Sequence, residues 1–193
     1  KDLLIKELLP RKRIVRYHEY DKVNQAQLII LCSLNNLTEF ERRYTIKLYN
    51  EIIGGSANSI LFENVREKHS YCYYINSSVK AYDNILLINS GVEQENIDKT
   101  IKLVRKTLKS INEGKLKEEN IISAKNTIIS GIKSASDEPM GIINTYFSKV
   151  LVGTPNEEER IANFNKITKE DIVKVSKKVT LHTILTLESK EDE

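Results

Sequence analysis

Four short runs of aliphatic and β-branched residues, spread along the chain, constrain its fold more than any other feature. They cover residues 25–34, 71–79, 85–92 and 181–187, and each has the length and composition of a strand. The turn signal Asp83-Asn84 separates the second and third runs and predicts an antiparallel hairpin. Because the first and last strands have to join the hairpin in one sheet, this order predicts an α+β fold, with a small, mostly antiparallel sheet and helices layered on one face.

Between these runs, apolar residues recur at the three- and four-residue spacing of amphipathic helices. One helix is predicted to begin after the capping residue Thr38 and to end at Gly54-Gly55, and a second helix covers residues 57–68. The segment between Glu93 and Lys178 has a helical period throughout. Its main apolar stripes are Ile97, Ile101, Val104 and Leu108; Ile121, Ile122, Ile128, Ile129 and Ile132; and Ile142, Ile143, Tyr146, Phe147, Val150 and Leu151.

The same patterns divide the chain into three parts. Residues 1–24 are predicted to hold the end of a preceding amphipathic helix, at residues 2–9, and then a polar, basic connector. Residues 25–188 form the predicted single α+β domain, and residues 189–193 form a charged tail. Since the chain opens on Lys1 without the features of a signal peptide, we interpret it as a piece of a longer protein.

The amino-acid composition argues against some classes of function for this chain. The 30 Lys and Arg residues nearly balance the 27 Asp and Glu residues, so the surface lacks the broad positive face that attracts nucleic acid. No stretch approaches the ~20 apolar residues that cross a bilayer. The two cysteines, Cys32 and Cys72, are too few for a disulfide framework, which indicates a reducing compartment. We therefore expect a cytoplasmic protein that neither binds nucleic acid nor spans a membrane.

Residues that carry metal or hydrolytic chemistry are sparse. The three histidines, His18, His69 and His182, are far apart, and the sequence has no His-x-x-His, His-x-x-Glu-His or Cys-x-x-Cys motif. We interpret His69 as an exposed residue at a helix end, where the helix dipole favours it. Gly-x-Ser-x-Gly is absent, and Cys72 has no obvious base. We therefore expect no catalytic residue, no metal ligand and no cofactor in this chain.

One segment has a more specific pattern. From Gly54 to Tyr74 it reads Gly-Gly-Ser-Ala-Asn-Ser-Ile-Leu-Phe-Glu-Asn-Val-Arg-Glu-Lys-His-Ser-Tyr-Cys-Tyr-Tyr. It resembles the second, C-terminal domain of the pitrilysin/insulinase family of zinc metallopeptidases (inverzincins), which includes the mitochondrial processing peptidases. The family pattern is a Gly-Gly turn, Leu-Phe, Val-Arg-Glu-Lys and, seven residues after the arginine, a tyrosine on the next strand. Arg66 and Tyr73 match those two positions, and the resemblance extends over about residues 25–187.

The resemblance implies a clamshell enzyme built from two domains of this fold. In the family, the N-terminal domain supplies a His-x-x-Glu-His zinc helix, so Zn²⁺ is expected in the N-terminal domain of the parent chain or in a partner chain. The family's arginine and tyrosine reach towards the scissile carbonyl of a peptide substrate, which makes Arg66 and Tyr73 the expected substrate-binding residues. A hydrogen-bond donor aimed at a developing oxyanion contributes on the order of 3 kcal/mol. Tyr74 competes with Tyr73 for this role, because successive strand residues face opposite sides.

The chain departs from the family pattern directly after Arg-Glu-Lys. Many active members continue Arg-Gly-Leu-Ala-Tyr, whereas this chain has His69-Ser70-Tyr71-Cys72-Tyr73. Such differences resemble bacterial members that occur as paired chains, one of which has lost the zinc motif. Three hypotheses therefore stay open. The chain is a substrate-clamping domain that is inactive alone, or a non-catalytic interaction and scaffold domain that docks an active peptidase chain or forms a homodimer, or an unrelated α+β ligand-binding domain.

Overall fold

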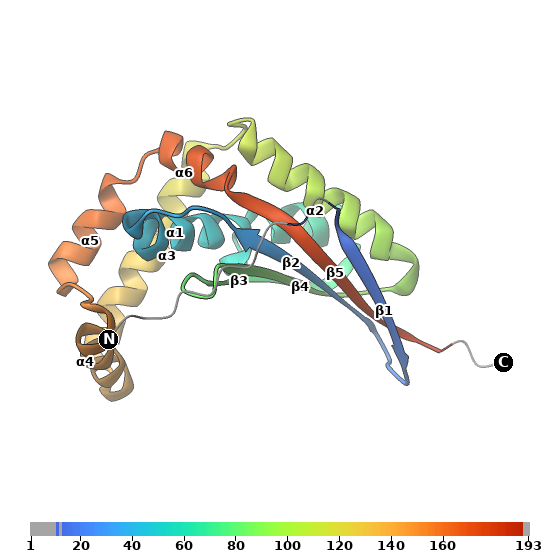
Figure 1. The fold of residues 1–193 in the computed structure, drawn as a ribbon, viewed down its shortest axis with the longest axis horizontal. Coiled ribbons are helices and arrows are strands. Elements are labelled where there is room, and N and C mark those ends of the chain that lie inside the picture. The colour runs from blue at the N-terminus through green and yellow to red at the C-terminus, as the bar shows by residue number, and fades with distance from the viewer. Residues whose placement is uncertain (1–10, 12, 191–193) are drawn as a thin grey trace.

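A five-stranded sheet in the order β1-β5-β2-β4-β3 organises the chain. The computed structural model describes residue 11 and residues 13–190. Its strands are β1 Val15–Asp21, β2 Ala26–Leu34, β3 Cys72–Lys80, β4 Ile85–Val92 and β5 Val179–Ser189. The last strand lies between the first two (Figure 1), and its pairing with β1 is parallel, whereas the other pairs are antiparallel. The predicted fold, a mostly antiparallel sheet with helices on one face, is confirmed.

The edge strand β1 corrects one prediction. We expected residues 11–24 to be a connector because they are polar and basic, but Val15–Asp21 pairs with β5 over its whole length. An edge strand can form from such residues because backbone hydrogen bonds to one neighbour hold it, and its side chains need not be buried. At the other end, Ser189 belongs to β5 and not to the tail. The helix end predicted at residues 2–9 lies outside the described residues, as do residues 191–193.

Most of the helices pack on one face of the sheet. The first is α1, which is extended by a π-helical turn on each side. A further π-helical segment precedes the β3–β4 hairpin, and a 3-10 turn follows it. The helical elements are Glu41–Thr45, α1 Ile46–Asn50, Glu51–Gly55, Phe62–Glu67, Gln94–Asn96, α2 Ile97–Asn112, α3 Glu118–Asp137, α4 Pro139–Val152, α5 Glu157–Lys166 and α6 Lys169–Ser176.

A side-chain cap explains where the first helix begins. The hydroxyl of Thr38 accepts from the amide of Glu41 at 3.2 Å, and the Glu41 carboxylate accepts from the amide of Thr38 at 2.7 Å. This is a capping box, which satisfies two backbone donors at the helix start. The second predicted helix begins later than expected, at Ile60, because Ala57-Asn58-Ser59 forms a turn.

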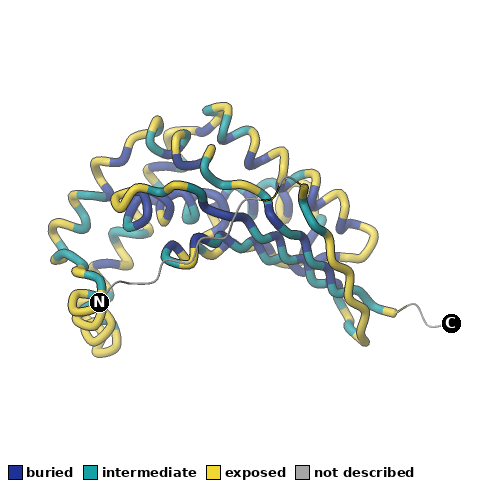
Figure 2. The backbone as a smooth tube through the Cα atoms, in the orientation of Figure 1, coloured by how far each residue is buried: buried dark blue, intermediate teal, exposed yellow. Residues whose placement is uncertain are grey.

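The core lies between the helices and one face of the sheet. Alternate residues of the central strands are buried, and the residues between them are only partly buried (Figure 2). The buried set includes, from the sheet, Leu28, Ile30, Leu86, Ile88 and Ile184, and, from the helices, Ile46, Leu48, Ile53, Val104, Ile111, Ile121 and Ile172. Strands from both ends of the chain therefore contribute to a single core.

Helix α4 does not follow this pattern. None of its residues is buried, and its large apolar side chains are 54% to 70% exposed. Its polar residues Asn144, Thr145 and Ser148 instead line a pocket against the body of the domain. The apolar stripe predicted for this helix thus exists, but it faces solvent. The six predicted residues Ile142, Ile143, Tyr146, Phe147, Val150 and Leu151 are all exposed, and Met140 joins them on the helix surface.

Candidate functional site

Arg66 lies in the last turn of the helical segment Phe62–Glu67, and its side chain is exposed. Its guanidinium carbon stands 4.8 Å from the centroid of the Phe62 ring, a cation–π contact one turn back along the helix. The amide of Ser70 donates to the Arg66 carbonyl oxygen at 3.0 Å, and the φ of +53° at Ser70 turns the chain towards β3. The helix end and the start of β3 are therefore held next to each other.

Tyr73 and Tyr74 lie at a β-bulge near the start of β3. The register with β4 shifts between Cys72 and Tyr74, so Tyr73 is the additional residue. Tyr73 is 58% exposed and Tyr74 is 38% exposed. Tyr74 pairs with Gly91, and its hydroxyl donates to the side-chain oxygen of Gln27. The bulge interrupts the alternation of inward-facing and outward-facing side chains along β3, and neither tyrosine is buried. The sequence pattern could not indicate this bulge.

Glu93 orients the phenol of Tyr73. The Tyr73 hydroxyl donates to the Glu93 carboxylate, and this hydrogen bond, with the negative charge of Glu93, raises the pKa of Tyr73. This interaction favours the protonated phenol, which is the form that donates a hydrogen bond. The sequence analysis missed Glu93, because only the pairing of Cys72 with Val92 brings Glu93 beside the start of β3.

The three histidines lie in separate places. On β1, the Nδ1 of His18 lies 3.1 Å from the Glu188 carboxylate. At a helix end, the Nδ1 of His69 lies 2.6 Å from the carbonyl oxygen of Asn64 and donates to it, and His182 is buried in β5. Among residues 13–190, no three His, Cys, Asp or Glu side chains form a group that could hold a metal. The donor set that zinc requires is therefore not found in the described chain.

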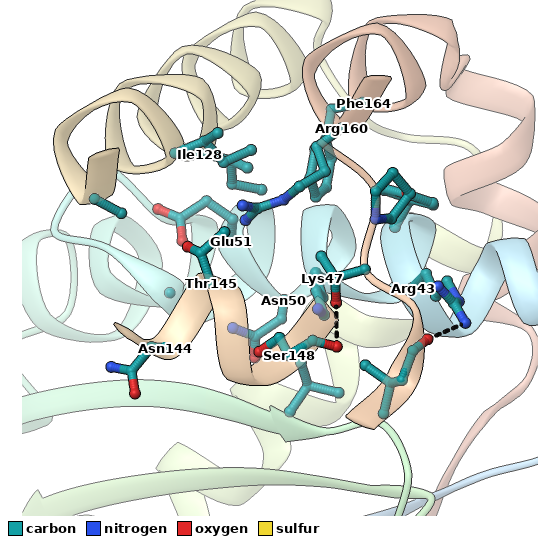
Figure 3. Close-up of a pocket in the computed structure, with 18 of the residues that line it drawn as sticks. Arg43, Lys47, Asn50, Glu51, Ile128, Asn144, Thr145, Ser148, Arg160 and Phe164 are labelled. Carbon is teal, nitrogen blue, oxygen red and sulfur yellow. Dashed lines mark hydrogen bonds between the residues drawn. The ribbon is translucent and has the colours of Figure 1, made fainter. Parts of the chain in front are cut away.

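A second candidate site is a pocket of about 710 Å³ that α4 partly covers (Figure 3). Residues of the helix around α1 and of α3, α4 and α5 line it. Arg43 donates to the carbonyl oxygens of Val152 at 2.6 Å and Gly153 at 3.0 Å, which fixes the C-terminal end of α4. No sequence motif marks this pocket, because Arg43 and Gly153 are 110 positions apart.

The pocket has a mixed polar and apolar lining and carries an excess of positive charge. Lys47 and Arg160 line it together with the carboxylate of Glu51. Burial lowers the pKa of Lys47, and the charges of Arg160 and Arg43 lower it further. One Glu51 oxygen is buried without a hydrogen-bond partner in the described part of the chain.

The mostly antiparallel five-stranded sheet with one helical layer is an α+β fold that this chain shares with domains of M16 peptidases. The family model described as Peptidase M16 inactive domain matches residues 6–128, so the chain belongs to this family. The predicted resemblance to the pitrilysin/insulinase metallopeptidases is thereby confirmed, and the hypothesis of an unrelated ligand-binding domain is excluded.

Individual relatives agree with this assignment. The chain is 28% identical over 147 residues to the "Probable inactive metalloprotease YmfF" of Bacillus subtilis (strain 168), a match that covers 76% of this chain and 34% of that protein. It is 25% identical to a conserved protein from Enterococcus faecalis V583, whose crystal structure matches 98% of this chain and 45% of its own with a TM-score of 0.91.

The fold recurs in more distant relatives. The peptidase M16 inactive domain from Pseudomonas fluorescens is 16% identical, has a TM-score of 0.75 and matches 97% of this chain and 47% of its own. The chain spans between a third and a half of the length of these relatives. In the described residues, no helix is long and apolar enough to cross a membrane.

Proposed function

We propose that this chain is the peptide-clamping C-terminal domain of a metallopeptidase-like protein. Arg66 and Tyr73 donate hydrogen bonds to a peptide held between this domain and a second one. Zn²⁺ belongs to the N-terminal domain of the parent protein or to a partner chain, so this chain alone is inactive. The two free, buried cysteines support a reducing, cytoplasmic location.

The proposal rests on one observation: the side chains of Arg66 and Tyr73 are both exposed at the junction of one helix and β3. The Arg66 guanidinium stacks on Phe62 and forms no ion pair within residues 13–190, so its N–H groups can reach a ligand. The Tyr73 hydroxyl is held by the exposed Glu93 and can exchange that acceptor for a peptide carbonyl. Hydrogen bonds from a charged donor are the stronger kind, at about 1.5–3 kcal/mol each.

The test uses the complete parent protein, with its partner chain where one exists. Arg66→Ala and Tyr73→Phe should each weaken the binding of an extended peptide, or lower turnover, by about 10-fold or more, while thermal unfolding is unchanged. Arg105→Ala and Tyr20→Phe, which alter exposed residues on α2 and β1, serve as matched controls. Peptide binding equal to that of the controls would rule out the clamping role.

A second candidate function, an interaction domain, is favoured by the exposed face of α4. Its seven apolar side chains cover half the helix circumference, with Lys149 as the only charged residue of the helix. Apolar patches of this kind mark protein–protein contacts more often than they remain in water. We propose that another peptidase-like domain, in the same polypeptide or in a partner chain, docks on α4.

Aspartate substitution on α4 tests this candidate. Phe147→Asp should weaken association with the separately produced N-terminal domain or partner chain by about 10-fold or more, since central aromatic residues dominate interfaces. Ile122→Asp on α3, also an exposed apolar residue, is the control. Isothermal titration calorimetry measures both, and equal affinities for Phe147→Asp and Ile122→Asp would contradict docking on α4.

A further inference from the structure

Two positively charged side chains in the pocket beside α4 have no ionic partner. Lys47 of α1 and Arg160 of α5 both line the pocket, and the guanidinium of Arg160 extends from α5 into it (Figure 3). Neither side chain forms an ion pair with any residue that the structure describes. The third cation, Arg43, is already held by Glu39 and by the C-terminal end of α4. The pocket therefore offers two positive charges to a ligand.

These positive charges act on one another. The pocket walls displace water from around the Lys47 ammonium group, which lowers its pKa, and the charges of Arg160 and Arg43 lower it further. The Lys47 side chain still keeps enough exposure for a ligand to reach it, and Arg160 is only partly buried. An anion between Lys47 and Arg160 would favour the charged form of the lysine and offset the repulsion.

Glu51 adds a hydrogen-bond acceptor to the same pocket. One oxygen of its carboxylate is buried and has no hydrogen-bond partner within residues 13–190. Although Arg160 also lines the pocket, the described structure has no ion pair between the two side chains. A buried acceptor without a partner costs stability, so a ligand that donates a hydrogen bond to Glu51 removes this cost.

The walls around these charges are partly polar and partly apolar. Asn144, Thr145 and Ser148 line the pocket from α4, the helix whose apolar side faces solvent. Ile128 and Phe164 line it from α3 and α5. An amphipathic helix normally turns its apolar side inward. The inward polar side of α4 therefore fits a pocket that holds a polar ligand and not core side chains.

We propose that this pocket binds a small organic carboxylate that also carries a hydrogen-bond donor and an apolar group. The ligand carboxylate lies between Lys47 and Arg160, whose planar guanidinium matches the geometry of a carboxylate. The donor bonds to Glu51, and the apolar group packs against Ile128 and Phe164. A carboxylate fits better than a phosphate dianion, because Glu51 repels a second negative charge. The volume of about 710 Å³ lies within the range of small-molecule pockets, roughly 300–1,000 Å³.

N-acetyl-leucine has all three groups and serves as the probe in an NMR titration of the ¹⁵N-labelled chain of 193 residues. We expect chemical-shift changes at the amides of Lys47, Thr145 and Arg160 and none at Arg66 and Tyr73. N-acetyl-leucinamide, which lacks the negative charge, should bind at least about 10-fold more weakly. Equal affinities for the two probes, or shift changes confined to Arg66 and Tyr73, would overturn the proposal. Because the same spectra follow both sites, the result is independent of the clamping role.

Two charge-removing variants test the assigned residues. Lys47→Gln and Arg160→Gln should each weaken N-acetyl-leucine binding by about 10-fold or more. Lys166→Gln is the matched control, since Lys166 is an exposed cation of α5 that does not line the pocket. Without ligand, neither pocket variant should lower the midpoint of thermal unfolding, because each removes an unpaired charge. An Arg160→Gln variant that is less stable but binds as well as the control would overturn the proposal and indicate a structural pair with Glu51.

Two further probes define the class of ligand. Inorganic phosphate should bind at least about 10-fold more weakly than N-acetyl-leucine, because it has no apolar group. The peptide N-acetyl-Ala-Ala-Ala-Leu should bind no more tightly than N-acetyl-leucine, since the recognised groups all belong to one residue. Tighter binding of phosphate would overturn the proposal in favour of an inorganic anion. At least 10-fold tighter binding of the peptide would overturn it in favour of a peptide end.

Discussion

Lys178 donates from Nζ to the Glu41 carboxylate at 2.6 Å, across 137 positions of the sequence. This ion pair joins the start of the first helix to the residue that precedes β5. Burial by itself raises the pKa of Glu41, but hydrogen bonds from Lys178 and from the amide of Thr38 outweigh burial and hold the pKa below its ordinary value. The ion pair therefore links the N-terminal and C-terminal parts of the domain, and it requires the Glu41 carboxylate to stay ionised.

Lys178→Ala should destabilise the protein in a way that depends on pH. Because the Glu41 pKa is lowered by folding, its contribution is present above the ordinary glutamate pKa and is lost as the pH falls through the folded value. We expect a loss of about 2 kcal/mol in the free energy of unfolding at pH 7 and a smaller loss at pH 3. Urea unfolding measures both, with Lys177→Ala as the exposed control. The same loss at both pH values would contradict the ion-pair explanation.

The titration of Tyr73 should depend on Glu93. Since a hydrogen bond to Glu93 raises the Tyr73 pKa, the phenol should ionise at a higher pH than tyrosine does in a peptide. Glu93→Gln should return the pKa towards its ordinary value, as followed by the Cζ chemical shift of Tyr73 in NMR. Glu95→Gln, which removes a neighbouring exposed carboxylate, should leave the titration unchanged. An identical titration in the Glu93→Gln variant and the unaltered chain would show that this hydrogen bond does not form.

Tyr49→Phe should be tolerated although Tyr49 is fully buried. Its hydroxyl has no hydrogen-bond partner within the described residues, and burial raises its pKa. Removing an unsatisfied polar group recovers its desolvation cost, so the free energy of unfolding should stay equal or rise by up to about 1 kcal/mol. Tyr20→Phe on exposed β1 should have no effect. A loss of more than about 1 kcal/mol in urea unfolding of Tyr49→Phe would reveal a partner for the hydroxyl.

Two glycine substitutions should have opposite signs. A Cβ on Gly54 would lie 2.6 Å from the Ser77 hydroxyl oxygen and 2.9 Å from the Ser77 backbone nitrogen, so Gly54→Ala should cost about 1–3 kcal/mol. A Cβ on Gly131 in α3 meets nothing within 4 Å, so Gly131→Ala should stabilise the helix by up to about 1 kcal/mol. Thermal unfolding compares the two, and destabilisation by Gly131→Ala would mean that another group occupies that space.

Much of the fold could be predicted because its signals are local. The hairpin follows from two β-rich runs around Asp83-Asn84, and the cap at Thr38 follows from a hydroxyl and an acid three positions apart. Arg66 and Tyr73 could be selected only through the family resemblance, since an exposed arginine or tyrosine has no distinctive sequence pattern. Their substrate-binding role stays a prediction.

Other features could not be predicted because they depend on partners distant in the sequence. Strand β1 has few aliphatic residues and exists because β5 offers backbone hydrogen bonds. Glu93 reaches Tyr73 through the pairing of β3 with β4, and the bulge beside Tyr73 exposes both tyrosines. The pocket beside α4 likewise forms only when helices from separate parts of the chain meet.

Helix α4 and the sheet show most clearly which structural features cannot be predicted from the sequence. By itself the sequence determined most of the helices and strands, β1 excepted, and which of their sides are apolar, because side-chain spacing follows the helical and strand periods. Only the tertiary structure decided that the apolar side of α4 faces solvent and that the helices cover one face of the sheet. The physical reason is that periodicity fixes a direction relative to an element's own axis, whereas burial depends on which other elements pack against it.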